Sequence, residues 1–250
     1  MDFGLIGCPL EHSLSQKYFC EKFGKLGLLD NKYSLFEIKK IEEIIPIIEK
    51  TPTLKGLNVT SPYKQQICNF LDEIDREISK LRIINVVDII KKNNKNYLKG
   101  YNSDIYGIKK TLKEYLSKKY TKVLILGSGS SSLSCRFILE KFNIEYLVIS
   151  RNPIDNNYLK YDEITKQTVE HHNIIINTTT LGIYPEIDNY PKIPYQFLTK
   201  NHICFDLIYN PKETKFLKLC SEYGAKIING EEMFIEQAEK SWEIWNRKQT

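Results

Sequence analysis

Residues 56–64 of the sequence place side chains that can bind a ligand and move a proton at the end of an apolar strand. Asn58 and Thr60 lie two residues apart, so on an extended segment their polar groups point the same way. Pro62 ends the strand and suits the first turn of a following helix, which would also contain Lys64. Because ligands of open α/β sheets bind at the carboxyl ends of strands, this pattern predicts a lysine beside a ligand.

Residues 100–104 repeat this arrangement, with Asn102, Ser103 and Asp104 after a strand and at the start of a helix. A single lysine that follows a turn is usually a solvated surface residue, so Lys64 alone would be weak support for a site. A lysine and an aspartate at two such strand ends, however, can share one cleft and act as a proton-transfer pair. The two segments together favour an enzyme.

Length and composition limit the classes of protein. The 250 residues, 42% of them apolar, suffice for two modest domains. The net charge of +5 comes from scattered lysines, which argues against nucleic-acid binding and suits an anionic small ligand. The six cysteines form no CxxC pair, which indicates buried thiols in a reducing compartment. We find no signal peptide and no apolar run near the ~20 residues of a membrane span, so we expect a soluble, cytoplasmic protein.

The order of elements in the first hundred residues indicates a parallel sheet. Strands are expected over residues 2–7, over 32–38 and up to Asn58, and helices from Ser13 to about residue 27 and over 41–50. This β-α-β-α-β order is typical of α/β domains. Two short helices are expected between residues 62 and 80, and the strands 83–90 and 97–100 flank an Asn-rich turn that predicts a hairpin.

Several polar residues of this region have two open interpretations. Ser13 is a good helix N-cap, and Ser13 and Ser15 either serve the helix terminus or bind a carboxylate there. His12 beside them is either a ligand contact or a loop histidine bonded to backbone, and the second is favoured. Asn85 lies in an apolar run and needs partners, which are either a ligand hydroxyl or a neighbouring loop.

A second α/β pattern starts at Lys122, with a buried strand over 122–126, the loop Gly-Ser-Gly-Ser-Ser-Ser and a helix over 133–142. This strand–turn–helix is close to the G-x-G-x-x-G dinucleotide fingerprint. Gly127 would make the tight turn and Gly129 would let a pyrophosphate approach the backbone, while Ser132 replaces the third glycine with another small residue. We expect a Rossmann-type dinucleotide-binding unit.

The residues after the next strand, 146–149, select among dinucleotides. An NAD enzyme usually carries an acidic residue here for the ribose 2′-hydroxyl, whereas this chain has Ser150, Arg151 and Asn152. A guanidinium suits a 2′-phosphate, so we expect NADP as the cofactor. The alternative is that Arg151 is a solvated charge at a strand end.

The remaining elements complete the second domain and return to the first. Strands are expected over 173–177, 203–206 and 226–228, with the threonines 178–180 beside the cofactor, and helices over about 211–223 and 231–247. Gln237 of the last helix either faces solvent or projects toward the first domain. We expect an α/β fold of two domains: an open, mostly parallel sheet domain of residues 1–103 plus 231–250 for substrate and catalysis, and a Rossmann-type NADP-binding domain of residues 104–230.

With these residues in place, the chain resembles the shikimate dehydrogenase family along nearly its whole length. The resemblance implies reversible, NADPH-dependent reduction of 3-dehydroshikimate to shikimate, a step toward aromatic amino acids. It also implies a substrate side formed by the N-terminal domain and the last helix. The matching segments are residues 7–15, 56–64, Asn85, 100–104, 127–131, 176–177, 206–214, and 230–237 with Trp245.

The resemblance assigns a role to each matching residue. Ser13 and Ser15 would hold the substrate carboxylate, with Tyr209 nearby, and Lys64 and Asp104 would stand at the reacting carbon, either of them as the principal base. Ring hydroxyls would be bound by Thr60, Asn85, Asp104 and Gln237, with Asn58 supporting the pocket. The cofactor set would be Gly127, Ser128, Gly129, Ser130, Ser131, Ser150, Arg151, Asn152 and Gly230.

The chain departs from the family pattern in both domains, and the departures bear on cofactor affinity more than on the chemistry. Ser130 and Ser131 replace a glycine-alanine pair, and a second basic residue expected near Asp155 is absent. Two alternatives follow: a quinate/shikimate dehydrogenase that uses NAD, or a module that binds the substrate without turnover. Arg151 opposes the first and the Lys64–Asp104 pair opposes the second. We expect small-molecule ligands, no metal, no nucleic acid, no membrane, and a monomer or homodimer.

Overall fold

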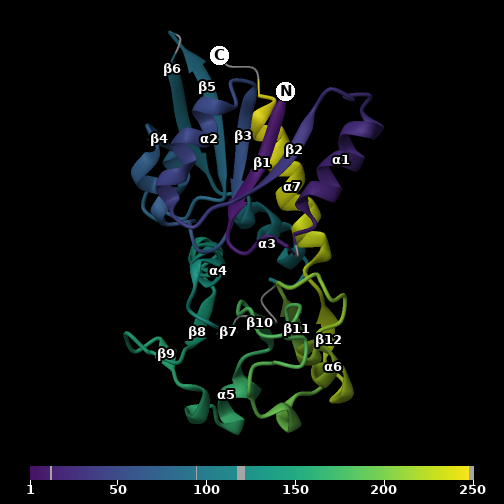
Figure 1. Ribbon diagram of the computed structural model, residues 1–250. Coiled ribbons are helices and arrows are strands. Elements are labelled where there is room, and N and C mark those ends of the chain that lie inside the picture. The colour runs from purple at the N-terminus through teal and green to yellow at the C-terminus, as the bar shows by residue number, and fades with distance from the viewer. Residues whose placement is uncertain (12, 94, 117–121, 248–250) are drawn as a thin grey trace. The chain divides into compact units, whose positions relative to one another are not determined.

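The computed structural model of the protein describes residues 1–11, 13–93, 95–116 and 122–247 (Figure 1). His12 lies outside the described residues, and so does Asn94 of the predicted hairpin turn. The chain divides into two compact units, Met1–Ser103 with Ala238–Thr250 and Asp104–Gln237. The last helix therefore passes from the second unit to the first after Gln237, and not at its start as the sequence predicted. In the part of the chain described, no helix combines the length and the apolarity needed to cross a membrane.

The first unit contains a six-stranded sheet in the order β2-β1-β3-β5-β6-β4. β1 pairs in parallel with β2 and β3, whereas β5 runs antiparallel to β3 and β6. The predicted β-α-β-α-β start and the hairpin are thus confirmed. The elements are β1 (Asp2–Gly7), α1 (Ser15–Lys25), β2 (Lys32–Glu37), α2 (Ile44–Lys50), β3 (Leu54–Val59), β4 (Glu73–Ile74), β5 (Val86–Lys92) and β6 (Lys95–Tyr101).

An aromatic cluster attaches the end of α7 (Glu231–Trp245) to this sheet. The indole of Trp245 lies 4.9 Å from the ring of Phe3 and 5.5 Å from that of Phe19, measured between centroids. Its Nε1 donates a hydrogen bond to the carbonyl of Val87 at 3.1 Å. A Cβ at Gly56 would overlap this indole, so only glycine at that position lets the helix approach the strand. The residues one turn earlier on α7 are thereby fixed over the sheet.

Two local predictions in the first unit are wrong. Residues 61–65 form turns, and the first helical segment after β3 is a short 3₁₀ helix, Gln66–Phe70. The amide of Tyr63 donates to the carbonyl of Thr60 at 3.0 Å, so the chain closes a tight turn where a helical turn was expected. Ser13 is not the cap of α1, whose N-cap is Leu14 without a side-chain hydrogen bond.

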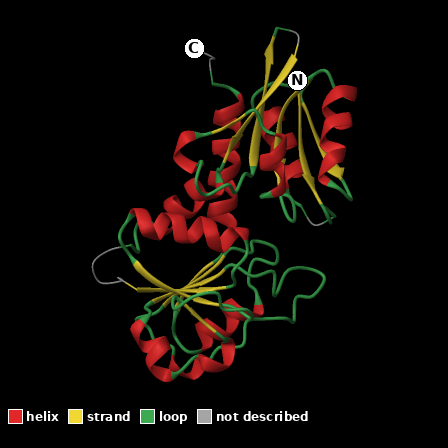
Figure 2. Cartoon of the chain, turned by 90° about the vertical axis from the view of Figure 1, so that its left-hand side faces the viewer, coloured by secondary structure: helices red, strands yellow, loops and turns green. Residues whose placement is uncertain are grey.

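The second unit contains a fully parallel sheet in the order β12-β11-β10-β7-β8-β9. Helices lie on both faces of this sheet (Figure 2). From the other edge this is the 3-2-1-4-5-6 order of Rossmann folds, with the topological switch between β7 and β10. The predicted fold class is confirmed. The elements are α3 (Asp104–Leu112), β7 (Lys122–Leu126), α4 (Ser130–Lys141), β8 (Glu145–Ile149), β9 (Tyr158–Leu159), α5 (Lys166–His171), β10 (Ile174–Asn177), β11 (Ile203–Asp206), α6 (Lys215–Glu222) and β12 (Lys226–Ile228).

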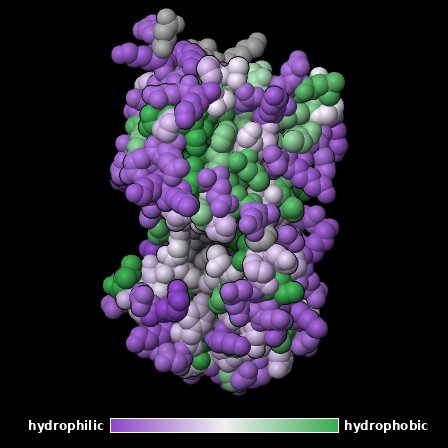
Figure 3. Space-filling model, viewed as in Figure 1, coloured by the Kyte–Doolittle hydropathy of each residue, from purple (hydrophilic) through white to green (hydrophobic). Residues whose placement is uncertain are grey.

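Each unit buries its apolar side chains around its own sheet. Leu57 and Val59 of β3 are at most 1% exposed in the first unit, and Leu124 and Leu126 of β7 are fully buried in the second. Hydrophilic residues cover most of the surface in the space-filling view (Figure 3). The polar side chains that are nevertheless buried therefore stand out, and several of them, such as Asn58, Asn177 and Asp206, lie at strand ends.

Candidate active site and cofactor site

One edge of the first sheet gathers the segments that carry the predicted substrate residues. The loop after β1 is bonded to its neighbours there, since Cys8 N donates to Ser61 O at 3.1 Å and Leu10 N donates to a carboxylate oxygen of Glu37 at 2.9 Å. In the antiparallel part, Val86 is paired with both Asn58 and Tyr101. β5 therefore begins, and β6 ends, at the edge where β1, β2 and β3 end. This edge carries Ser13, Ser15, Asn58, Thr60, Lys64, Asn85 and the segment that leads to Asp104.

Thr60 and Lys64 lie in the turn after β3, and both are half-buried. Thr60 N donates to the carbonyl of Ile6 at 2.9 Å, and the Thr60 methyl occupies the space that a Cβ on Gly7 would need. The carbonyl of Lys64 accepts from Ile84 N at 2.8 Å. The backbone of this turn is thus held from both sides, by β1 and by the segment that precedes β5.

Asn58 and Asn85 use their side-chain amides inside the protein. Asn58 accepts a hydrogen bond from the hydroxyl of Tyr33 at 2.8 Å and donates to Asn85 O at 3.2 Å and to Ser241 Oγ at 3.0 Å. Asn85 Oδ1 accepts from Ser103 N at 2.6 Å, and Asn85 Nδ2 donates to Ser103 Oγ at 3.0 Å. Of the two partners considered for Asn85, the structure therefore shows the neighbouring loop.

The serine pair lies at the start of α1. Ser15 is the first helical residue, and its backbone amide donates to Ser13 Oγ at 3.3 Å. Both serines are half-buried. The amides of a first helical turn have no intrahelical acceptors, so this terminus suits an anion. Their role in carboxylate binding stays a prediction.

Asp104 and Gln237 lie on two helices that pack closely in the second unit. Asp104 is the first residue of α3 and is 7% exposed. α7 passes beside α3 at Gly107, where a Cβ would lie 2.6 Å from the carbonyl of Met233 and 3.4 Å from Cβ of Gln237. Gln237 is half-buried, and its Nε2 donates to the carbonyl of Phe234 at 3.1 Å. Its contact with the substrate stays a prediction.

Tyr209 and Gly230 lie around the loop that follows β11. The ring of Tyr209 is 4.4 Å from the ring of Phe234 on α7, measured between centroids. Gly230 N donates to Ile208 O at 3.0 Å, and a Cβ at Gly230 would collide with the carbonyl of Leu207. Gly230 thus lets the start of α7 contact this loop, while its predicted contact with the cofactor stays a prediction.

The glycine-rich loop follows β7 at the topological switch of the parallel sheet. Gly127 has φ +105°, and a Cβ there would lie 2.9 Å from both Thr178 Oγ1 and Thr179 Cγ2, so the position requires glycine. Gly129 is the N-cap of α4, and a Cβ at Gly129 would meet nothing within 4 Å. α4 begins at Ser130, earlier than predicted, which brings the amides of its first turn to this open space. The arrangement fits a pyrophosphate.

The predicted 2′-phosphate residues lie after β8. Ser150 is 4% exposed, its hydroxyl is 2.9 Å from that of Ser128, and it accepts from Asn152 N at 3.1 Å. Arg151 is exposed, but its charge acts on Tyr161, where burial raises the pKa to about 12 and Arg151 opposes the rise. An exposed arginine two residues after β8 suits a 2′-phosphate, so the residues present fit NADP.

Two features were not predicted from the sequence. One is the buried hydrogen-bond network around Asp206 in the second unit, and the other is the participation of Tyr33 and Ser241 in the network around Asn58 in the first unit. Asp206, fully buried, accepts hydrogen bonds from Asn177 Nδ2 at 3.1 Å, Ile208 N at 3.0 Å and Thr214 Oγ1 at 2.6 Å. Burial raises the pKa of Asp206 to about 6. A charged residue at the end of an apolar strand was the available signal. Tyr33 and Ser241 gave no signal, because they resemble ordinary core and helix residues.

A Rossmann-type dinucleotide unit, joined to an α/β unit with polar groups gathered at one strand edge, defines a nucleotide-dependent oxidoreductase. The family model for the shikimate dehydrogenase substrate binding domain matches residues 5–87. The shikimate dehydrogenase (NADP(+)) of Methanococcus aeolicus is 37% identical, over 97% of this chain and 90% of its own length. That of Methanosphaera stadtmanae is 34% identical, over 98% and 91%. A crystal structure of shikimate dehydrogenase in complex with NADP+ has a TM-score of 0.82 at 30% identity, covering 98% of this chain and 89% of the other. The chain belongs to the shikimate dehydrogenase family.

Proposed function

We propose that the protein catalyses the reversible, NADPH-dependent reduction of 3-dehydroshikimate to shikimate, a step toward aromatic amino acids. The family relatives that cover nearly the whole chain are named shikimate dehydrogenase (NADP(+)). The observation in this chain that supports the proposal most is the gathering of Thr60, Lys64 and Asn85 at one sheet edge, where β6 also ends before Asp104.

The substrate roles follow the chemistry of each side chain. Ser13 and Ser15 offer hydroxyls at a helix N-terminus and would hold the carboxylate, with Tyr209 nearby. Thr60, Asn85 and Gln237 would bind ring hydroxyls. Asn58 has its amide committed to Asn85 O and Ser241 Oγ, so it would support the pocket from behind.

Lys64 and Asp104 would carry the proton that accompanies hydride transfer. NADPH supplies the hydride to the carbonyl carbon, and the oxygen of that carbonyl then needs a proton. In reduction the Lys64–Asp104 pair donates it, and in oxidation the pair takes it from the hydroxyl. Where Asp104 is the principal base, the ammonium of Lys64 would stabilise the negative charge that develops on the oxygen.

The cofactor would be bound mostly by backbone. Gly127, Ser128 and Gly129, with Ser130 and Ser131 in the first turn of α4, would surround the pyrophosphate. Ser150, Arg151 and Asn152 would contact the ribose 2′-phosphate, and Gly230 would also contact the cofactor. The open space around Gly129 supports this assignment, since a pyrophosphate needs close approach to the backbone.

We also propose that the protein works in the cytoplasm on small molecules alone, as a monomer or homodimer. Its six cysteines are free thiols, and Cys68, Cys135, Cys204 and Cys220 are buried, as suits a reducing compartment. Its 36 basic and 31 acidic residues are interspersed, so nucleic acid is not an expected partner.

The decisive experiment mixes the purified protein with NADPH and 3-dehydroshikimate and follows the loss of NADPH absorbance. We expect turnover with NADPH, much slower turnover with NADH, and the reverse reaction with shikimate and NADP+. Quinate with NAD+ is the competing pair. Faster oxidation of quinate with NAD+ would overturn the assignment, and so would shikimate binding without turnover.

A further inference from the structure

A continuous chain of buried hydrogen bonds crosses the first unit and ends at the residue before Asp104. Its members are Tyr33 on β2, Asn58 on β3, Ser241 on α7, Ser103 before α3 and Asn85 before β5. Ser241 Oγ lies 3.0 Å from Asn58 Nδ2 and 3.1 Å from Ser103 Oγ. All five residues are at most 7% exposed. Buried polar groups in such a chain hold one another in a single arrangement.

Most proton donors of this chain of hydrogen bonds are fixed by the chemistry of the groups. Tyr33 donates to the oxygen of Asn58, and the amide nitrogen of Asn58 then donates to Ser241. Ser241 Oγ and Ser103 Oγ share a hydrogen bond of 3.1 Å in which either hydroxyl can donate. The backbone amide of Ser103 donates to Asn85 at 2.6 Å. Ser103 is thus held through both its side chain and its backbone, directly before the first residue of α3.

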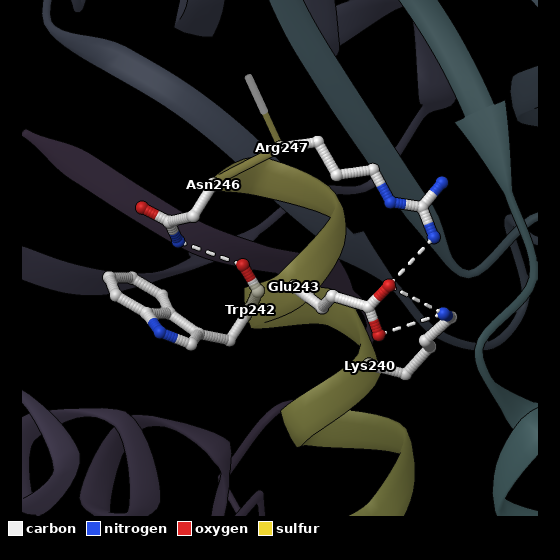
Figure 4. A network of polar contacts seen from close by, with 5 residues as sticks. All are labelled: Lys240, Trp242, Glu243, Asn246 and Arg247. Atoms are coloured by element: carbon white, nitrogen blue, oxygen red, sulfur yellow. Dashed lines mark hydrogen bonds and ion pairs between the residues drawn. The ribbon is translucent and has the colours of Figure 1, made fainter. Parts of the chain in front are cut away.

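The position of Ser241 is itself set by the packing of α7. Trp245, one turn later and on the same face, is bonded to Val87 O and fitted against Gly56. On the outer face, Glu243 is paired with Lys240 at 2.8 Å and with Arg247 at 3.0 Å (Figure 4). One face of α7 therefore carries the buried hydrogen bonds of Ser241, and the outer face carries an ordinary surface ion-pair network.

We propose that Ser241 and Tyr33 are positioning residues for Asp104, which act through Ser103. Neither touches the reacting atoms. Their hydrogen bonds fix the backbone from which Asp104 starts α3, and so fix the direction of its carboxyl group for proton transfer. The inference rests on the proposed function, because it assumes that Asp104 takes part in the reaction.

The test is a mutant cycle on the full chain with NADPH and 3-dehydroshikimate. Ser241→Ala and Tyr33→Phe should each lower kcat by about three- to tenfold, as expected for loss of one neutral hydrogen bond, with the KM for NADPH unchanged. In the Asp104→Asn background the same two changes should lower kcat by less than about twofold, because their effect passes through the carboxylate.

Matched controls separate positioning from general destabilisation. Glu243→Gln removes a contact on the outer face of α7, and Tyr195→Phe removes a buried tyrosine hydroxyl that donates to Pro191 O in the second unit. Both should leave kcat unchanged. Should Ser241→Ala fail to fold, Tyr33→Phe carries the test, because the ring that stacks on Phe19 at 4.5 Å remains. Equal losses in both backgrounds, or no loss in either, would overturn the inference, whereas an inactive wild type would overturn the proposed function instead.

Discussion

The two sheets differ at the edges that are proposed to bind ligands. At the edge of the first sheet, side-chain amides and hydroxyls are bonded to one another, as Asn58, Asn85 and Ser103 show. At the switch point of the second sheet, the backbone around Gly129 is open, and a Cβ would meet nothing within 4 Å. At the first edge, side chains bonded to one another form the proposed site. At the second edge, the absence of a side chain at Gly129 leaves the backbone open.

This difference matches the chemistry that each edge is proposed to perform. A small polyhydroxylated ring has to be oriented relative to a proton donor, which requires side chains held in one conformation. A pyrophosphate is bound by many amides at a helix N-terminus and requires mainly free space. Substitutions at the first edge should therefore change kcat, and those at the second should change the KM for the cofactor.

The largest effect is expected at the proton-transfer pair. Lys64→Ala should lower kcat by at least about a hundredfold, which is the usual contribution of a general acid–base group. Asp104→Asn should do the same, and the double variant should be little worse than either single one, because coupled residues are not additive. The measurement is steady-state kcat beside an NADPH titration by fluorescence. A Lys64→Ala protein that keeps most of its kcat would remove the lysine from the mechanism.

The second expected effect separates the two glycines of the cofactor loop. Gly129→Ala should raise the KM for NADPH by about tenfold or more without changing the melting temperature, because the new methyl meets no protein atom and occupies space left for the pyrophosphate. Gly127→Ala should instead lower the melting temperature, since Gly127 has φ +105°. The opposite pattern would show that the open space does not receive the cofactor.

Features that depend on local pattern were predictable, and those that depend on distant packing were not. The parallel strands and the turn at Gly127 follow from apolar runs and glycine spacing. The start of α4 at Ser130 does not follow from them, because serines are typical of loops, whereas this helix accepts them in its first turn. Ser241 could not be found from the sequence, because its partners Asn58 and Ser103 lie 183 and 138 residues away.

Cofactor selectivity gives a third test, at the second edge. Arg151→Ala should weaken NADPH binding by about tenfold and leave NADH binding nearly unchanged, since one charge-assisted contact to the 2′-phosphate is lost. The ratio of kcat/KM for the two cofactors is the measurement. Lys200→Ala, an exposed cation before the start of β11 and thus at the opposite edge of the sheet, is the control. An unchanged ratio in Arg151→Ala would leave the arginine as a solvated surface charge.

A smaller effect is expected at the residues that would bind the substrate carboxylate. It is an exception to the expectation that substitutions at the first edge change kcat. Ser15→Ala should raise the KM for shikimate severalfold with kcat nearly unchanged, because the carboxylate is remote from the reacting carbon and is bound alike before and during reaction. Ser221→Ala, an exposed helical serine of the second unit, serves as the control. A loss in kcat alone would mean that Ser15 acts on the reaction centre.

The smallest expected effect concerns Asp206. Its carboxylate is the centre of a side-chain hydrogen-bond network at the second edge, where the proposed ligand contacts are otherwise made mostly by backbone. Burial raises the pKa of this carboxyl from 3.8 to about 6, so between these values the folded protein binds a proton that the unfolded chain does not. Its contribution to stability is therefore present at low pH and decreases as the pH rises toward 6. Relative to Asp206→Asn, the free energy of unfolding of the wild type should increase by about 1 kcal/mol between roughly pH 7.5 and pH 5, at about 1.4 kcal/mol per unit below the folded pKa. Urea unfolding at the two pH values measures this difference, with Asp162→Asn as an exposed control. If the two proteins show the same pH dependence, Asp206 is ionised at the same pH in both states, and its three hydrogen bonds compensate fully for its burial.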